Sequence, residues 1–292
     1  MTLFISQLIN GLHVGSIYAL IALGYTMVYG IIRLINFAHG DILMIGAYTV
    51  IIAIGSLGLS PIAAILLSIL VCVAFGVLIE KIAYRPLRNS PKISSLITAI
   101  GVSILLQNVA LLLFTPTPKP YPITLSLPPI TLGNVQISFT TLLTFGVSLL
   151  VMLALHAFVS ASKAGKSMRA VSEDMDAAVL MGINVNNTIT LTFAIGCALA
   201  GIGSVLYCIA YPSVSPTMGS LPGVKAFIAA VLGGIGLIPG AMLGGFLLGI
   251  AESLTKGYIS SKLSDAVVYG ILIVILLFKP AGLLGKSTRE KV

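Results

Sequence analysis

Long apolar runs are the feature that most constrains the fold of this chain. A helix that crosses the hydrocarbon core of a bilayer needs about 20 apolar residues at a rise of about 1.5 Å each. Eight segments of the sequence approach this length, and the seventh is read as two shorter, broken helices. We therefore predict an all-α, polytopic integral membrane protein with about eight transmembrane helices. The segments are residues 5–30, 40–58, 61–82, 93–114, 139–160, 188–210, 222–256 and 264–278.

The composition supports a membrane protein and disfavours other classes. Charged residues make up 8% of the 292 residues and hydrophobic residues 58%, whereas roughly 25% of a soluble domain is charged. No long polar block interrupts the apolar runs, so we expect residues 1–292 to form a single transmembrane domain. No nucleophile–base or metal-ligand pattern appears, and the three cysteines lie inside apolar runs. The sequence therefore predicts no catalytic residues, no metal site and no cofactor.

Lys and Arg are unevenly distributed between the loops. If the spans alternate in direction, 12 of the 16 basic residues fall on one side, mainly in residues 81–92, 160–187 and 279–292. Cytoplasmic loops carry such an excess, so we expect residues 160–187 and the C-terminus in the cytoplasm and the N-terminus outside. The net charge of +8 then belongs to the cytoplasmic loops of a membrane protein, and not to a nucleic-acid site. Lys225 lies near a span end and is expected to extend toward the interface.

The loop of residues 115–138 contains six prolines and lies on the predicted outer side. Apolar and polar residues alternate from residue 123 to residue 137, and Gly133–Asn134 is a dipeptide typical of a hairpin turn. Two structures remain open for this loop, a small β-ribbon and an extended proline-rich chain.

Small residues recur at four-residue spacing in several predicted helices. Such stripes let helix backbones approach closely in lipid. They predict a tightly packed bundle and indicate nothing about a substrate. The glycines concerned are Gly11, Gly15, Gly196, Gly240 and Gly244.

The loop of residues 160–187 contains AGKS, which resembles the end of a phosphate-binding loop. That motif needs a glycine five residues before Gly165, because glycine-permitted N–H groups wrap the phosphates, and the residue there is Ser160. A second near-match at Gly285 has Pro280 in the equivalent place. We therefore predict that this chain binds no nucleotide.

The apolar side chains of residues 168–182 recur at helical spacing. The pattern predicts one short, stiff, two-faced helix at the cytoplasmic surface, with Gly182 placed to end it in the left-handed conformation. Its polar face carries Glu173, Asp174 and Asp176. A helix that lies on anionic lipid favours a basic polar face, so this segment fits a docking element for a protein partner better.

Three sequence blocks resemble a known family. Residues 15–48 (GSIYALIALGYTMVYGIIRLINFAHGDILMIGAY), 169–184 (RAVSEDMDAAVLMGIN) and 226–252 (AFIAAVLGGIGLIPGAMLGGFLLGIAE) are similar to the signatures of LivH-type permeases. These permeases are the branched-chain amino acid subunits of bacterial ATP-binding-cassette (ABC) importers. The blocks are long and together bracket most of the chain.

The resemblance implies an all-helical permease that pairs with a second, homologous permease subunit. Two ATP-binding subunits would lie below the pair and a substrate-binding protein above it. The helix of residues 168–182 would be the coupling helix, which fits a groove on an ATP-binding subunit, and the chain itself would hydrolyse no ATP. The residues that the resemblance assigns to coupling are Arg169, Glu173, Asp174, Asp176, Ala178 and Gly182.

The segment NFAHGD could border a transport pathway. Asn36, His39 and Asp41 are polar residues between two spans, with Gly40 expected to break the helix and Asp41 suited to cap the next one. They form either a capped turn at the cytoplasmic surface or part of an inner gate, since polar groups at membrane depth are costly and tend to be functional.

The glycine-rich turn GGIGLIPG (233–240) is expected on the cytoplasmic side, between two short helices. Gly233, Gly234 and Gly236 either flank the pathway, as interrupted helices do in transporters, or serve packing alone. Glu252 is either a pathway residue or a charge that reaches the interface.

The leading hypothesis is a permease subunit for branched-chain or related hydrophobic amino acids. A urea or short-amide permease of the same architecture is the first alternative. An ion-coupled secondary transporter is the second, and it is disfavoured because charges within the predicted spans are nearly absent.

Overall fold

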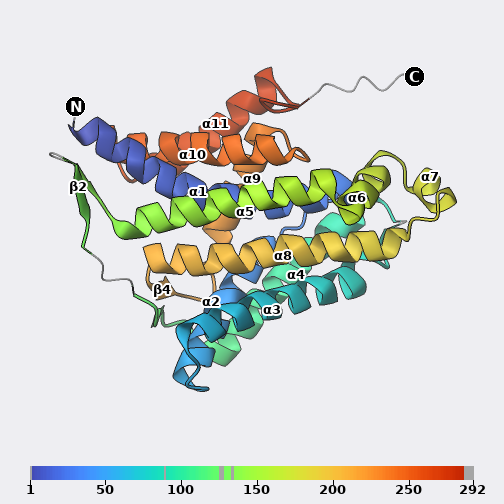
Figure 1. Ribbon diagram of the computed structural model, residues 1–292, viewed down its shortest axis with the longest axis horizontal. Helices are drawn as coiled ribbons and strands as arrows, with labels where there is room; N and C mark the ends of the chain where they lie inside the picture. Colours follow the sequence, from blue (N-terminus) through green and yellow to red (C-terminus); the bar gives the residue numbers. More distant parts are fainter. Residues whose placement is uncertain (1, 89, 125–127, 133–134, 286–292) are drawn as a thin grey trace.

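The computed structural model describes residues 2–88, 90–124, 128–132 and 135–285 (Figure 1). These residues form an elongated helical bundle with very little sheet, which confirms the predicted all-α membrane fold. The helices are α1 (Thr2–Ile32), α2 (His39–Gly55), α3 (Pro61–Ile79), continued by the π-helical turn η1 (Glu80–Tyr84), α4 (Lys92–Phe114), α5 (Phe139–Ala161), α6 (Lys163–Glu173), α7 (Met175–Leu180), α8 (Val185–Ala210), α9 (Ser220–Gly233), α10 (Ile238–Tyr258) and α11 (Ser264–Phe278). The strands are β1 (Lys119–Pro120), β2 (Ile130–Leu132), β3 (Val135–Ile137) and β4 (Ser213–Val214).

Six helices in the described part of the chain are long and apolar enough to cross a bilayer, namely α1, α3 with η1, α4, α5, α8 and α10. The apolar helices α2, α9 and α11 are shorter. The segment 222–256 divides into α9 and α10, but the prediction of two short helices is wrong for α10. Pro239 lies in the first turn of α10, and the helix then continues without a break to Tyr258.

The helix α1 lies at the centre of the bundle, and most of it is buried. Glycines let neighbouring backbones touch it: a Cβ at Gly15 would lie 2.9 Å from the carbonyl oxygen of Gly245 on α10. The structure places the predicted packing glycines at helix contacts, because a larger residue would force the helices apart. The pairs are Gly11 with Ile250, Gly15 with Gly245, Gly196 with Gly24, Gly240 with Gly233 and Gly244 with Ala229.

The two ends of the bundle carry different elements (Figure 1). At one end, which we call the hairpin end, β2 pairs antiparallel with β3, with Leu132 opposite Val135, and β1 pairs with β4. This confirms the β-ribbon alternative for residues 130–137, although the predicted turn at 133–134 lies outside the described residues. At the other end, which we call the α6–α7 end, α6 lies beside the turn between α9 and α10.

The half-length helices α2 and α9 meet at their N-termini inside the bundle. After α1 the chain turns back into the bundle. The ring of His39, at the start of α2, lies against Gly24 of α1. Gly24 is eight residues before the end of α1, so α2 begins about 12 Å inside that end of the helix. From this junction α2 runs toward the hairpin end and α9 toward the α6–α7 end. A Cβ at Gly40 would lie 2.5 Å from the Gly219 carbonyl oxygen, so the close approach requires glycine.

The structure corrects the interpretation of NFAHGD. Gly40 does not break a helix but lies in the first turn of α2, and Asp41 does not cap α2, since Ala38 holds the N-cap position without a side-chain hydrogen bond. Asn36, His39 and Asp41 are at most 2% exposed. The prediction of a capped turn at the cytoplasmic surface is therefore wrong, because the chain re-enters the bundle before α2 begins.

Candidate functional site

The segment of residues 168–182 is not the single stiff helix that the sequence predicts. The backbone is extended at Asp174 (φ −152°, ψ 115°), where α6 ends and α7 begins. The Asp174 carboxylate accepts hydrogen bonds from the N–H groups of Asp176 and Ala177, both at 2.9 Å. An aspartate that caps the following helix competes with continuation of the preceding one, so the helix divides at this residue.

The AGKS sequence lies in the first turns of α6. Ser162 caps this helix and accepts a hydrogen bond from the Gly165 N–H at 2.9 Å. Gly165 lies so close to the backbone of Val159 that a Cβ would collide with it. The glycine therefore serves the tight turn from α5 into α6. The second near-match, which begins at Gly285, continues into residues outside the described part of the chain.

Four of the six residues assigned to coupling shape this segment. Asp174 is the cap of α7, and Arg169 donates hydrogen bonds to the carbonyl groups of Val159 (3.0 Å) and Ser160 (3.2 Å) near the end of α5. Ala178 is buried in the hydrophobic core. These side chains hold α6 and α7 against the bundle.

Gly182 is the fourth of these residues, and it ends α7 in the left-handed conformation, as predicted (φ 78°). Its N–H bonds to the Val179 carbonyl at 2.9 Å, and the Ile183 N–H bonds to the Ala178 carbonyl at 3.0 Å. These are the two hydrogen bonds of the Schellman motif, which needs a residue that tolerates positive φ.

The other two assigned residues, Glu173 and Asp176, are exposed. Beside them Val179, Leu180 and Met181 form what we call the apolar tip, at the far α6–α7 end of the molecule (Figure 1). Their exposures are 58%, 87% and 82%. Leu180 and Met181 were missed among the candidate residues, although an apolar triplet at the end of a polar loop was an available signal. Exposed apolar residues of this kind mark a contact surface.

The helix α6 packs directly on the end of α1 and on the turn between α9 and α10. A small cavity of about 80 Å³ between these elements is lined by Met27 and Gly30 of α1, Met168 and Ser172 of α6, and Gly236 of the turn. A displacement of α6 would therefore act directly on α1 and on this turn.

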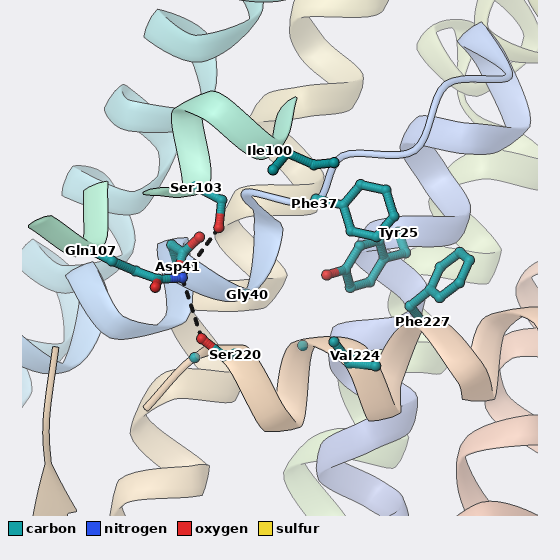
Figure 2. Close-up of a pocket in the computed structure, with 12 residues that line it drawn as sticks. Tyr25, Phe37, Gly40, Asp41, Ile100, Ser103, Gln107, Ser220, Val224 and Phe227 are labelled. Atoms are coloured by element: carbon teal, nitrogen blue, oxygen red, sulfur yellow. Dashed lines mark hydrogen bonds between the residues drawn. The ribbon is translucent and has the colours of Figure 1, made fainter. Parts of the chain in front are cut away.

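A second candidate site lies where α2 and α9 meet and α4 passes beside them. Its cavity of about 170 Å³, which we call the junction pocket, is bordered by the first turns of α2 and α9 and by one face of α4 (Figure 2). Its polar side chains are Asp41, Ser103, Gln107 and Ser220, and its apolar side chains are Tyr25, Phe37, Ile100, Val224 and Phe227.

Gln107 of α4 joins three helices at the polar side of the junction pocket. Its side-chain nitrogen lies 2.9 Å from Asp41 Oδ1, 3.2 Å from Ser103 Oγ and 3.3 Å from Ser220 Oγ. Of the predicted pathway residues, only Asp41 lines this pocket. Gln107 and Ser220 were missed, because nothing in their local sequence marks them and the contacts join distant segments.

Asn36 and His39 do not line the junction pocket. Asn36 accepts a hydrogen bond from the Tyr84 hydroxyl at 3.1 Å. The His39 ring packs against Gly24 and makes an edge contact with the Tyr25 ring, with centroids 4.8 Å apart. Both residues therefore support the re-entrant start of α2.

The predicted pathway glycines Gly233, Gly234 and Gly236 lie at the α6–α7 end. Gly234 and Gly236 have positive φ angles of 108° and 96°, and Gly233 touches Gly240 across the turn. They form the turn beneath α6 and line no wall of the junction pocket, so the structure separates the two predicted pathway groups.

Glu252 lies in a buried ion network and is 1% exposed. Its Oε1 lies 2.8 Å from Lys225 Nζ and 2.6 Å from Lys256 Nζ, and its Oε2 accepts a hydrogen bond from the Tyr18 hydroxyl at 2.9 Å. Lys225 also pairs with Asp265 at 2.7 Å. The prediction that Lys225 extends to the interface is therefore wrong, because two carboxylates hold its ammonium group between α9, α10 and α11.

A further buried acid, Glu80, lies near the α6–α7 end. It pairs with Arg88 at 3.0 Å and accepts a hydrogen bond from the Thr190 hydroxyl at 2.8 Å. Burial lowers the pKa of the Arg88 guanidinium, which stays charged because its ordinary value is far above neutral pH. Charges inside the helices are thus more frequent than the sequence analysis expects, and basic side chains lie beside Glu80 and Glu252.

Half-length helices that meet at a polar pocket inside a bundle of membrane-spanning helices are typical of transporters. The chain is therefore a multi-pass membrane transport protein. A family model described as "Branched-chain amino acid transport system / permease component" matches residues 7–276. The chain belongs to this family of permeases.

Curated relatives cover almost the whole chain. It is 48% identical to the high-affinity branched-chain amino acid transport system permease protein BraD of Pseudomonas aeruginosa, over 99% of this chain and 98% of that protein. It is 44% identical to the corresponding protein LivH of Salmonella typhimurium, with the same coverage. It is 29% identical to a probable branched-chain amino acid transport permease of Methanocaldococcus jannaschii, over 94% and 90% of the two chains. No solved structure matches.

These relatives are permeases, so the comparisons confirm the predicted family and the prediction that the chain is not an enzyme.

Proposed function

We propose that this chain is a permease subunit of an ABC importer that carries branched-chain or related hydrophobic amino acids across the bacterial inner membrane. The observation that carries the proposal is 48% identity, over nearly the full length, to a branched-chain amino acid permease. The same relatives favour this solute class over urea or short amides, and favour an importer subunit over an ion-coupled carrier.

The proposed contact with an ATP-binding subunit is the apolar tip together with Glu173 and Asp176. The tip projects from the bundle at the end where α6 meets α1, so a partner that moves the tip would move α6 as well. Exposed leucine and methionine fit an apolar groove, and the flanking carboxylates fit a basic rim. This end, with the C-terminus, would face the cytoplasm and the two ATP-binding subunits.

A second, homologous permease subunit would cover the open side of the junction pocket. Ile100 of α4 and Val224 of α9 are exposed at this opening, next to the polar side chains of the pocket. Polar groups that face hydrocarbon are costly, so a protein surface or a water-filled path is favoured there over lipid. A substrate-binding protein would then dock at the opposite, hairpin end.

The experiment that tests the coupling role compares two exposed leucines. Leu180→Glu places a charge on the apolar tip, and Leu57→Glu, a matched control for association with the ATP-binding subunit, places one at an exposed leucine of the α2–α3 connection, away from the tip. Vesicles that contain the full assembly are assayed for ATP-driven leucine uptake, and the ATP-binding subunit that co-purifies is quantified. We expect Leu180→Glu to lose at least tenfold in both measurements.

Asp176→Lys reverses one of the flanking charges and is expected to weaken association at low ionic strength more than at high ionic strength. Wild-type uptake in both Leu180→Glu and Asp176→Lys, with as much ATP-binding subunit co-purified as with Leu57→Glu, would refute the proposed contact.

A further inference from the structure

Asp41 differs from the other buried acids of this protein. Glu80 has Arg88 beside it, and Glu252 has two lysines. Within the described residues no salt bridge reaches Asp41, although the residue is only 2% exposed. The polar side chains beside its carboxylate are neutral: Gln107, whose amide donates a hydrogen bond to Asp41 at 2.9 Å, and Ser103.

An unpaired carboxylate at this depth carries a large desolvation cost. The first turns of α2 and α9 both border it, and the partial positive charge of helix N-termini offsets some of this cost. The pocket itself supplies no Lys, Arg or His side chain. The cavity beside Asp41 gives room for a cationic group of a ligand.

The opposite side of the junction pocket is apolar. The rings of Tyr25, Phe37 and Phe227 form an aromatic wall there, with the Tyr25 hydroxyl directed toward Gly40, and Val224 and Ile100 extend the wall toward the opening (Figure 2). At about 170 Å³ the cavity is smaller than the pockets of drug-sized ligands, which begin near roughly 300 Å³. It suits a small solute with a cationic end and a compact hydrocarbon end.

We propose that the junction pocket is a binding site for the transported amino acid within the permease itself, with Asp41 as the partner of the substrate ammonium group. The substrate carboxylate would lie toward Ser220 and the first turn of α9, and the branched side chain against the aromatic wall. The inference rests on the proposed function and adds to it a site in this chain, beyond any site in a substrate-binding protein. The two half-length helices run to opposite ends of the bundle from this site, so their separation would open it to either side.

The first test measures equilibrium binding of radiolabelled L-leucine to the full chain in nanodiscs, with whichever partner subunits co-purify and without a substrate-binding protein. Asp41→Asn keeps the size of the side chain and removes its charge, whereas Asp41→Glu keeps the charge. We expect Asp41→Asn to weaken leucine binding at least tenfold and Asp41→Glu to weaken it less. The competitor 4-methylpentanoate, which is leucine without its amino group, should bind the wild-type and Asp41→Asn chains equally weakly.

A second pair of variants tests the pocket without touching its charge. Val224→Phe fills the cavity from α9, and Leu105→Phe, the matched control, adds an aromatic ring at an exposed position of α4 outside the pocket. Val224→Phe should weaken leucine binding at least tenfold, with Leu105→Phe within twofold of wild type. Size-exclusion profile and melting temperature show whether the Asp41 variants fold. If they do not, this pair of variants still tests whether leucine binds in the junction pocket.

The two proposals fail in distinguishable ways. If Asp41→Asn and Val224→Phe change neither the KM nor the maximal rate of ATP-driven leucine uptake, the site is overturned and the importer function stays in place. Leucine binding that depends on Asp41, in an assembly without ATP-driven uptake, would support the site and overturn the importer function. Equal loss of leucine and 4-methylpentanoate binding in Asp41→Asn would overturn the role of Asp41 as the ammonium partner.

Discussion

Replacing Glu252 and Asp265 separately and together tests how the buried ion network holds α9. Lys225 Nζ lies 2.8 Å from Glu252 and 2.7 Å from Asp265, so the loss of either carboxylate alone leaves the ammonium group one partner. Lys225 and Glu252 are buried, whereas the Asp265 side chain is 47% exposed. The two acids therefore substitute for each other, and their removal should not be additive.

The magnitudes follow from this geometry. Glu252→Gln loses charged hydrogen bonds but leaves Lys225 paired with Asp265, so its expected cost is about 2 kcal/mol of unfolding free energy. Asp265→Asn removes a half-exposed partner and should cost about 0.5 kcal/mol. The double variant leaves a buried ammonium group without a carboxylate, at an expected cost of about 4 kcal/mol. The coupling energy is then about 1.5 kcal/mol, above the value for independent sites.

The assay is the equilibrium unfolding free energy of the four proteins in lipid bicelles, measured by steric trapping. Lys225→Met in the double-variant background is the control, because it removes the unpaired charge and should recover about 2 kcal/mol or more. Additivity of the two single effects within about 0.5 kcal/mol would refute the reasoning, since it would mean that Lys225 reaches water or headgroups whenever a partner is lost.

Four further substitutions test local features. Gly15→Ala places a methyl group 2.9 Å from the Gly245 carbonyl oxygen and should cost about 1–3 kcal/mol in the same assay. Gly146→Ala, whose added Cβ meets no atom within 4 Å, should stabilise α5 by up to about 1 kcal/mol. Asp174→Ala removes the cap of α7 and should lower the stability of this helix by about 1 kcal/mol. Amide hydrogen exchange in α7 should then accelerate roughly fivefold. Gly182→Val forces a β-branched residue to a φ of 78° and should accelerate the same exchange.

Each of these has an outcome that would contradict it. Equal stability of Gly15→Ala and Gly146→Ala would be inconsistent with backbone contact between α1 and α10. Unchanged exchange in Asp174→Ala would mean that tertiary packing, not the cap, holds α7. Gly182→Asn is the matched control for Gly182→Val, because asparagine tolerates the left-handed region, and identical effects of the two would exclude backbone strain as the cause.

Most spans could be predicted from the sequence because the requirement for a membrane helix is local. Residues 93–114 and 139–160 were predicted as spans, and α4 and α5 coincide with them within one residue at each end. The position of Gly182 at the end of a helix was also predictable, since the Schellman motif depends on neighbouring residues. The break at Asp174 was not, because the apolar spacing continues through it and only the cap geometry divides the helix.

The candidate site was predictable only in part. Asp41 was selected as a polar residue between spans, but its partner Gln107 lies 66 positions away, and no pattern within either segment indicates the contact. Lys225 was placed at the interface because its position near a span end suggests that its ammonium group can escape, whereas the structure surrounds it with Glu252 and Asp265.

The sequence by itself determined that this chain is a bundle of membrane helices with a projecting loop segment at one end, because hydrophobic length and charge spacing act within single segments. Only the tertiary structure decided that α2 and α9 begin inside the bundle and meet at Gly40 and Gly219. It also decided that Glu80 and Glu252 are paired with basic side chains and that Asp41 borders the junction pocket. These features depend on which distant residues lie side by side, and that is set by helix packing rather than by local composition.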